Sequence, residues 1–206
     1  MELDEDLFYL IGALRDGSVF YDKAARTYQL VWYSNSSEYL KNSINERILK
    51  VFNKTPKIYE YKNHQFRVRI TSKDAYNLVK NTFKFPKDGV GQIAWGTSEI
   101  LLNAEKKLKH AYIRAMFDAE GDVSLGNRYI EVSQKNTEIL EWIMKEFKML
   151  NIKTGKIVIA DKKSMTYKFV IAGKSDVANF QNEINFENEM KKNQLQILVG
   201  KYKINA

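Results

Sequence analysis

The sequence repeats itself once, and this internal repeat constrains the fold more than any other feature. Four short segments recur in the same order, with offsets between 99 and 104 residues. The matches pair DGSV at 16–19 with EGDV at 120–123, SEYL at 37–40 with TEIL at 137–140, TPKI at 55–58 with TGKI at 154–157, and ITSK at 70–73 with IAGK at 171–174. Recurrence in one order indicates two related units. The sequence therefore predicts two half-domains, residues 1–97 with a linker over 84–97, and residues 98–206.

Hydrophobic periodicity predicts the same order of elements in both halves: helix, hairpin, helix, hairpin, helix. In the first half, helices are expected at 5–16, from Ser36 or Ser37 to Phe52, and from Thr71 or Ser72 to Phe83, with hairpins over 17–33 and 57–70. In the second half, helices are expected from Ser98 or Leu108 to Glu120, from a cap at Thr137, from Ser175 to Phe186 and over 187–203, with strands at 122–134, 156–160 and 165–172. Helices that alternate with antiparallel hairpins indicate an α+β protein.

Charge and composition limit the partners and the kinds of catalytic site that the protein can have. A net charge of +8 favours a polyanionic partner such as nucleic acid. The absence of cysteine excludes thiolate chemistry and cysteine-ligated metals, and two histidines leave little room for a histidine-rich metal site or a Ser-His-Asp triad. Catalysis, if present, would depend on carboxylates, lysines and a hard cation. The sequence shows neither a signal layout nor an apolar run of membrane-spanning length, so an intracellular, soluble protein is expected.

Each half opens with an apolar helix that ends at an acid followed by glycine: LFYLIGALRDG at 7–17 and HAYIRAMFDAEG at 110–121. Small residues on these helices, Gly12, Ala13, Ala111, Ala115 and Ala119, would allow close helix packing and bring Asp16 and Glu120 together. Two carboxylates at the negative ends of helices attract a hard divalent ion. Each acid alone could be an ordinary helix end. An acid at the C-terminal end of a helix is electrostatically disfavoured. Its presence at the matching position of both repeats therefore favours a functional role over a structural one.

The segments YLIGALRDGSV (9–19) and YIRAMFDAEGDV (112–123) resemble the paired motifs of LAGLIDADG homing endonucleases. The resemblance implies two pseudo-symmetric αββαββα half-domains, each with a four-stranded antiparallel saddle-shaped sheet, joined through a two-helix motif interface. It further implies that a monomer cuts both strands of double-stranded DNA at a long asymmetric site and leaves staggered ends. Mg²⁺ is the expected cofactor, with Mn²⁺ or Ca²⁺ able to occupy the same sites. The expected metal ligands are Asp16, Glu120 and the backbone carbonyls of Arg15 and Ala119.

The first motif departs from the family pattern at one position. Arg15 directly precedes the acid, where the family usually has a small residue. We therefore expect this side chain to crowd the end of the first helix.

Further site residues are expected from their places in the repeat and from the resemblance. Lys73 and Lys174 follow the fourth strand of their halves, where the family often has an active-site lysine, and Gln134 and Lys135 occupy another family position that reads Ser34-Asn35 in the first half. Side chains on the exposed faces and hairpin tips of the sheets are expected to contact DNA. They are Arg26, Gln29, Val31, Tyr33, Lys62, His64, Arg67 and Arg69 in the first half, and Asn127, Arg128, Glu131, Ser133, Lys162, Lys163 and Lys168 in the second. The three tryptophans, Trp32, Trp95 and Trp142, are expected to pack in the core or linker.

Two other functions fit parts of this pattern. A DNA- or RNA-binding protein of the same fold without catalysis, such as a maturase or regulator, is the first, although such proteins usually lose one acid and both are present here. An unrelated basic enzyme acting on a small metabolite is the second, and no glycine-rich phosphate loop or nucleophile motif supports it. The Met1 start and short length favour a free-standing, intron-encoded protein. The expected location is the cytoplasm of an archaeon or bacterium, or an organelle.

Overall fold

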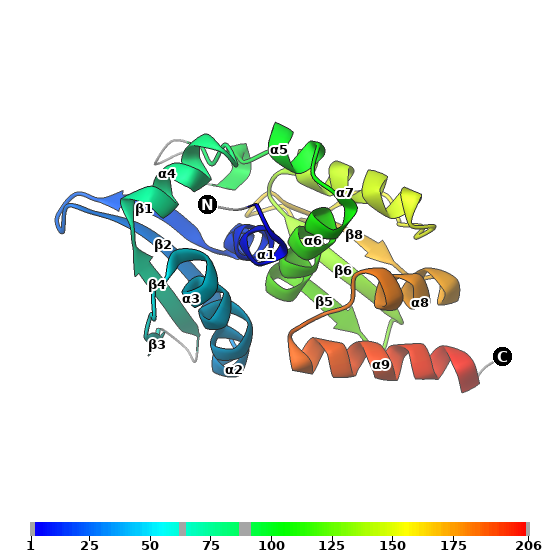
Figure 1. The fold of residues 1–206 in the computed structure, drawn as a ribbon. Coiled ribbons are helices and arrows are strands. Elements are labelled where there is room, and N and C mark those ends of the chain that lie inside the picture. The colour runs from blue at the N-terminus through cyan, green and yellow to red at the C-terminus, as the bar shows by residue number, and fades with distance from the viewer. Residues whose placement is uncertain (1–2, 62–64, 87–91, 205–206) are drawn as a thin grey trace. The chain divides into compact units, whose positions relative to one another are not determined.

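The computed structural model describes residues 3–61, 65–86 and 92–204, and the chain divides into two compact units, Met1–Ala119 and Glu120–Ala206 (Figure 1). The helix that opens the second repeat belongs by its contacts to the first unit. The boundary between the units therefore falls later than the predicted boundary between the repeats at 97. The two repeat boundaries, 1–97 and 98–206, remain a prediction about sequence organisation.

The first unit contains a four-stranded antiparallel sheet with strand order β1-β2-β4-β3. Its elements are α1 (Glu5–Ala13), the 3-10 turn η1 (Leu14–Asp16), β1 (Ser18–Asp22), β2 (Thr27–Ser34), α2 (Ser37–Tyr39), the π-helix η2 (Leu40–Asn45), α3 (Glu46–Phe52), β3 (Ile58–Glu60), β4 (Phe66–Thr71), α4 (Lys73–Asn81), the 3-10 turn η3 (Gln92–Ala94), α5 (Glu99–Leu102) and α6 (Lys106–Glu120). Ser36 and Ser72 cap α2 and α4 as predicted, each accepting a backbone N–H three residues on.

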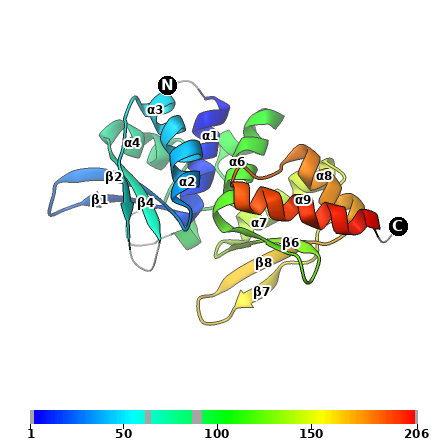
Figure 2. The ribbon, with the colours of Figure 1, turned by 90° about the horizontal axis from the view of Figure 1, so that it is seen from below.

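The core of the first unit lies between the sheet and its helices, which gather on one face of the sheet (Figures 1 and 2). Alternation along the central strands directs Leu30 and Trp32 of β2, and Val68 and Ile70 of β4, towards the helices. Helix α1 is buried along its length from Leu7 to Ala13. The indole N–H of Trp32 donates to the backbone oxygen of Leu10 at 2.9 Å, which joins sheet and helix.

The second unit repeats this architecture with strand order β5-β6-β8-β7, again antiparallel. Its elements are β5 (Gly121–Ser124), β6 (Tyr129–Gln134), α7 (Thr137–Met149), β7 (Val158–Asp161), β8 (Thr166–Ile171), α8 (Lys174–Glu183) and α9 (Glu189–Ile204). Phe147 of α7 packs edge-on against Phe169 of β8 and Phe180 of α8, with ring centres 6.1 and 6.0 Å apart. The predicted α+β class, with one four-stranded antiparallel sheet for each repeat, is confirmed.

Three local predictions are corrected by the structure. Asn136, not Thr137, caps α7, because its side-chain oxygen accepts the N–H of Ile139 at 3.2 Å. Helix α8 begins at Lys174 after Gly173, one residue before the expected start at Ser175. The helix after β2 widens into the π-helix η2, which a simple 3.6-residue period does not predict.

The tryptophan prediction is confirmed, since Trp32, Trp95 and Trp142 are all buried. Among the described residues, no helix is long and apolar enough to cross a membrane.

Candidate functional site

Helices α1 and α6 approach closely at Gly12, within the first unit. A Cβ atom added at Gly12 would overlap the backbone oxygen of Tyr112 and lie 3.0 Å from the Cβ of Ala115. Only a residue without a side chain fits at this contact. The prediction that small residues allow close helix packing is confirmed here for Gly12 and Ala115.

Asp16 ends a tight turn that connects α1 to the sheet. The α-helix gives way to η1 after Ala13, and the N–H of Gly17 donates to the backbone oxygen of Leu14 at 2.8 Å. A Cβ at Gly17 would meet the backbone oxygen of Val31 in β2 at 2.5 Å, so the chain passes against the central strand here. Asp16 is therefore half-buried between the end of α1 and the start of β1.

Arg15 does not crowd the helix end, so that expectation is wrong. Its side chain is fully buried and turns into a cage made by Trp95, Gly96 and Tyr112. The guanidinium donates from Nε to the Tyr112 hydroxyl at 2.7 Å, from Nη2 to the backbone oxygen of Gly96 at 2.9 Å, and from Nη1 to the backbone oxygen of Trp95. Its central carbon lies 4.0 Å from the centre of the Trp95 ring.

Burial in this cage also acts on Tyr112. Removal from water raises the pKa of the Tyr112 hydroxyl, and the nearby Arg15 guanidinium opposes that rise in pKa. The hydroxyl is therefore neutral at physiological pH and can accept from Arg15. Neither the role of this tyrosine nor the cage was predicted from the sequence.

Glu120 is the last residue of α6, and a buried glutamine holds it. The side-chain Nε2 of Gln134 donates to Oε1 of Glu120 at 3.2 Å, while Oε1 of Gln134 accepts the N–H of Lys135 at 3.2 Å. This second bond orients the amide so that its NH₂ group faces the carboxylate. The structure thus brings together two of the predicted site residues, Glu120 and Gln134.

The other acid of the second motif, Asp118, plays a different part. Its side chain is buried and accepts the hydroxyl of Tyr9 at 2.5 Å, and that hydroxyl lies 3.1 Å from the hydroxyl oxygen of Tyr39. Asp118 therefore ties α6 to α1 inside the first unit. Glu120 is half-buried at the helix end, where a ligand could reach it.

The residues at the two helix ends fit a hard cation. Each end offers one carboxylate, and the backbone oxygens of a last helical turn lack partners within the helix. Among the described residues, no group of three or more histidine, cysteine, aspartate or glutamate side chains gathers to bind a metal. A cation at either helix end would need water or phosphate oxygens as further ligands. That arrangement is typical of Mg²⁺ and not of structural zinc.

Two of the three predicted lysines, Lys73 and Lys174, lie at matching positions of the two repeats. Lys73 and Lys174 are the first residues of α4 and α8, and Lys135 follows β6; all three are exposed. Within the part of the chain that the structure describes, none of the three ammonium groups forms a hydrogen bond or an ion pair. Each could reach a bound phosphate without first breaking a contact.

In the first unit, the predicted DNA contacts differ in accessibility. Arg67 and Arg69 lie on the sheet face away from the helices, opposite Tyr33 and Val31 in the strand register, and the Arg67 guanidinium lies 4.8 Å from the Tyr61 ring centre. Gln29 and Val31 share this face but are buried, with Gln29 bonded to Asp22, Thr27 and Arg69. A base could touch them only after neighbouring side chains move.

The remaining predicted contacts of the first unit lie at its loops. Arg26 is exposed at the β1–β2 tip and has a left-handed backbone with φ of 54°. Lys62 and His64 lie outside the described residues.

In the second unit, the face away from the helices carries Glu131, Ser133 and Lys168. The Lys168 ammonium pairs with the Glu131 carboxylate at 2.7 Å, and this hydrogen bond is the main cause that raises the pKa of Lys168. Four further predicted contacts, Asn127, Arg128, Lys162 and Lys163, are exposed at the two hairpin tips.

The sequence of this chain is similar to a family model and to known proteins. Residues 107–185 match the model of the LAGLIDADG-like domain. Homing endonuclease I-ApeI of Aeropyrum pernix is 29% identical over 198 residues, covering 95% of this chain and 87% of the relative. DNA-directed RNA polymerase subunit Rpo1C of Methanocaldococcus jannaschii is 27% identical over 97% of this chain, which spans only 22% of that protein.

Solved structures show the same fold. The crystal structure of I-DmoI in complex with DNA and Mn superposes with a TM-score of 0.68 at 21% identity, covering 89% of this chain and 97% of that one. Full-length DUF199/WhiA superposes with a TM-score of 0.65 at 16% identity, covering 98% of this chain and 61% of that one. The chain thus contains a LAGLIDADG-like domain at residues 107–185, and it has the two-unit fold seen in I-DmoI.

Proposed function

We propose that this protein is a site-specific endonuclease that hydrolyses both strands of double-stranded DNA with a divalent cation. The observation that carries the proposal is the acid that ends a motif helix before glycine in both repeats, with Glu120 held by the buried amide of Gln134. Similarity to homing endonuclease I-ApeI and to I-DmoI, which has been solved with DNA and Mn, supports it. The net charge of +8 suits a DNA partner.

Asp16 and Glu120 are proposed to bind the cation together with the backbone carbonyls of Arg15 and Ala119. A bound Mg²⁺ would supply a water of lowered pKa and would offset charge on the leaving oxygen. Gln134 fixes the orientation of the Glu120 carboxylate through its hydrogen bond. Lys73, Lys135 and Lys174, all exposed, would offset charge on the scissile phosphate.

The proposal also covers the metal ion, the DNA site and the ends that cleavage leaves. Mg²⁺ is the proposed ion in the cell, and I-DmoI has been solved with Mn, Mg and Ca in separate structures. The protein is proposed to act as a monomer on a long asymmetric site, to leave staggered ends, and to be encoded by an intron.

The sheet faces are the proposed DNA-binding surface, and the Glu131–Lys168 pair offers a test of it. Glu131→Gln replaces the carboxylate that raises the pKa of Lys168 with an uncharged amide, yet the ammonium stays protonated at neutral pH. The face gains one net positive charge. The slope of log K against log salt for non-specific DNA is therefore expected to steepen by up to about 0.9.

Glu141→Gln is the matched control for this slope. It makes the same change of charge on an exposed residue of α7, which packs on the other face of the sheet. It should leave the slope nearly unchanged. Equal slopes for Glu131→Gln and the wild type would contradict DNA binding by this face.

A library selection separates the endonuclease from a binding protein without catalysis. Duplexes of random sequence are first selected for binding in EDTA, and Mg²⁺ or Mn²⁺ is then added to the bound fraction. The proposal expects one long consensus sequence and cleavage of it when the cation is added. A consensus that is bound but stays intact at every Mg²⁺ and Mn²⁺ concentration would replace the endonuclease with the catalytically silent alternative.

A further inference from the structure

The buried Arg15 cage has no counterpart in the second repeat, where Ala119 occupies the equivalent position. A buried guanidinium is costly unless its donors are satisfied. Here three acceptors and the face of the Trp95 ring surround it. The acceptors come from Trp95 and Gly96, between η3 and α5, and from Tyr112 of α6. The first repeat thus carries an anchor that the second repeat lacks.

The buried side chain of Arg15 fixes the position of the residue directly before Asp16. The η1 turn is only three residues long, and a 3-10 turn has poorer hydrogen-bond geometry than an α-helix. The turn alone would hold Asp16 weakly. Gly17 limits movement on one side through its close approach to Val31, and the Arg15 side chain fixes the backbone on the other.

We infer that Arg15 is a positioning residue for the cation bound at Asp16. Its buried side chain holds the 15–16 backbone so that the Asp16 carboxylate and the Arg15 carbonyl stay in place for the metal. This inference rests on the proposed function. Arg15 does not touch the metal through its side chain; it acts through Asp16.

Arginine suits this role better than lysine would. Its planar group directs donors to Tyr112, Trp95 and Gly96 at once while it stacks on the indole ring. A lysine keeps the charge but cannot reproduce the fork or the stacking. Arg15→Lys should therefore behave more like Arg15→Met than like the wild type.

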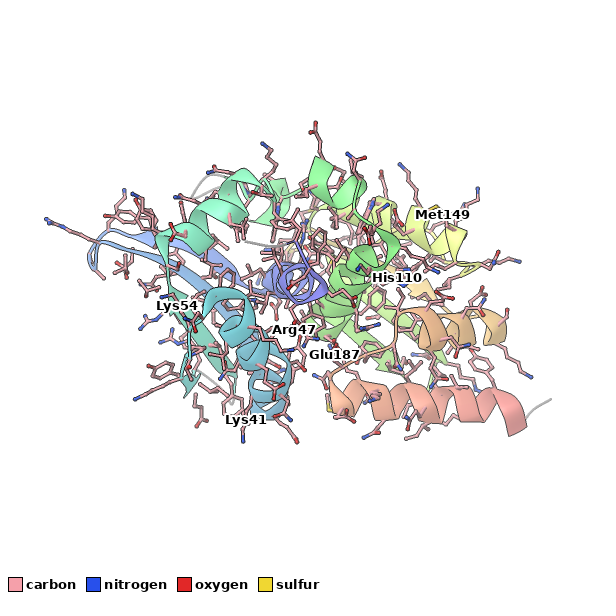
Figure 3. All side chains as sticks on the ribbon, viewed as in Figure 1. Lys41, Arg47, Lys54, His110, Met149 and Glu187 are labelled. Atoms are coloured by element: carbon pink, nitrogen blue, oxygen red, sulfur yellow. The ribbon has the colours of Figure 1, made fainter. Side chains whose placement is uncertain are left out.

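Arg47 of α3 provides a matched control within the same unit. Arg47, which is labelled in Figure 3, has its guanidinium carbon 4.0 Å from the Tyr9 ring centre, the same separation as for Arg15 and Trp95. Its Nε lies 3.0 Å from the Oδ1 of Asp6. Asp6 lies in the first turn of α1, at the opposite end from Asp16. Arg47→Met therefore removes a comparable stacked arginine whose contacts with Tyr9 and Asp6 lie outside the η1 turn that carries Asp16.

The experiment measures Mn²⁺ binding by electron paramagnetic resonance for the wild type, Arg15→Lys, Arg15→Met, Tyr112→Phe and Arg47→Met, with melting temperatures alongside. The Arg15 variants are expected to weaken Mn²⁺ binding by about 10- to 100-fold, as losses of groups that orient metal ligands do. Tyr112→Phe removes one acceptor and should fall between them and the wild type. Arg47→Met should lower the melting temperature while Mn²⁺ binding stays within about twofold of wild type.

The outcomes separate this inference from the proposed function. If the wild type binds Mn²⁺ and cuts DNA but Arg15→Lys and Tyr112→Phe bind Mn²⁺ as tightly as it does, Arg15 only stabilises the fold and the inference is overturned. If the wild type neither binds Mn²⁺ nor cuts any DNA, the proposed function fails and this inference fails with it. Should Arg15→Met not fold, Arg15→Lys and Tyr112→Phe carry the test.

Discussion

Glu120→Gln is expected to lose cleavage activity by at least about 10²- to 10³-fold while DNA binding persists. The introduced amide is neutral, so it cannot balance the charge of a divalent ion as the carboxylate does. It keeps the size of the side chain, and its oxygen can still accept from the Nε2 of Gln134. Stability should therefore change little, and the loss should appear in the rate. Single-turnover cleavage of the selected site measures it.

A control is needed to show that the loss of cleavage comes from removing this carboxylate and not from the change in net charge alone. Glu141→Gln, on the exposed side of α7, removes the same charge and should cut at the wild-type rate. Asp16→Asn should reproduce the loss, because Asp16 holds the matching position of the first repeat. A Glu120→Gln protein that still cuts normally would remove Glu120 from the metal site.

Gly12→Ala is expected to destabilise the protein by about 1–3 kcal/mol, the usual cost of overpacking a well-packed contact. The added Cβ would overlap the backbone oxygen of Tyr112, and a backbone atom cannot move aside as a flexible side chain can. The better helix propensity of alanine, worth up to about 1 kcal/mol, offsets only part of this cost. Urea denaturation measures the change in the free energy of unfolding.

Gly200→Ala makes the same substitution in a helix with open space. Among the residues that the structure describes, a Cβ at Gly200 of α9 meets no atom within 4 Å, so this variant should gain about 0.5–1 kcal/mol from helix propensity. The two substitutions thus have opposite expected signs. Stabilisation of both would contradict the close contact between α1 and α6.

Much of the fold could be predicted because the sequence contains two copies of the same order of helices and strands. The order of helices and strands recurs in the second half at offsets of 99 to 104 residues, so each half supports the prediction for the other. The π-helix at Leu40–Asn45 escaped prediction, since it changes the hydrogen-bond step without changing which residues are apolar. Asn136 and Thr137 are both good caps, and only the backbone angles decide between them.

The candidate site was predictable in position but not in contacts. The acids Asp16 and Glu120 follow from the motif pattern, while the Gln134–Glu120 hydrogen bond depends on strand register and a rotamer. Arg15 shows the limit most clearly, because a long side chain can leave a crowded helix end for a cage built from residues about 80 and 97 positions away. Neighbouring side chains likewise bury Gln29, although alternation places it on the predicted face.

We propose that this chain cuts both strands of DNA with a divalent cation. The direct measurement is cleavage of a duplex carrying the selected site, with each strand labelled separately and resolved on a denaturing gel. One cut in each strand at offset positions is expected with Mg²⁺ or Mn²⁺, and no cut is expected in EDTA. Both strands remaining intact under saturating protein and cation, on a duplex that the protein binds, would contradict it.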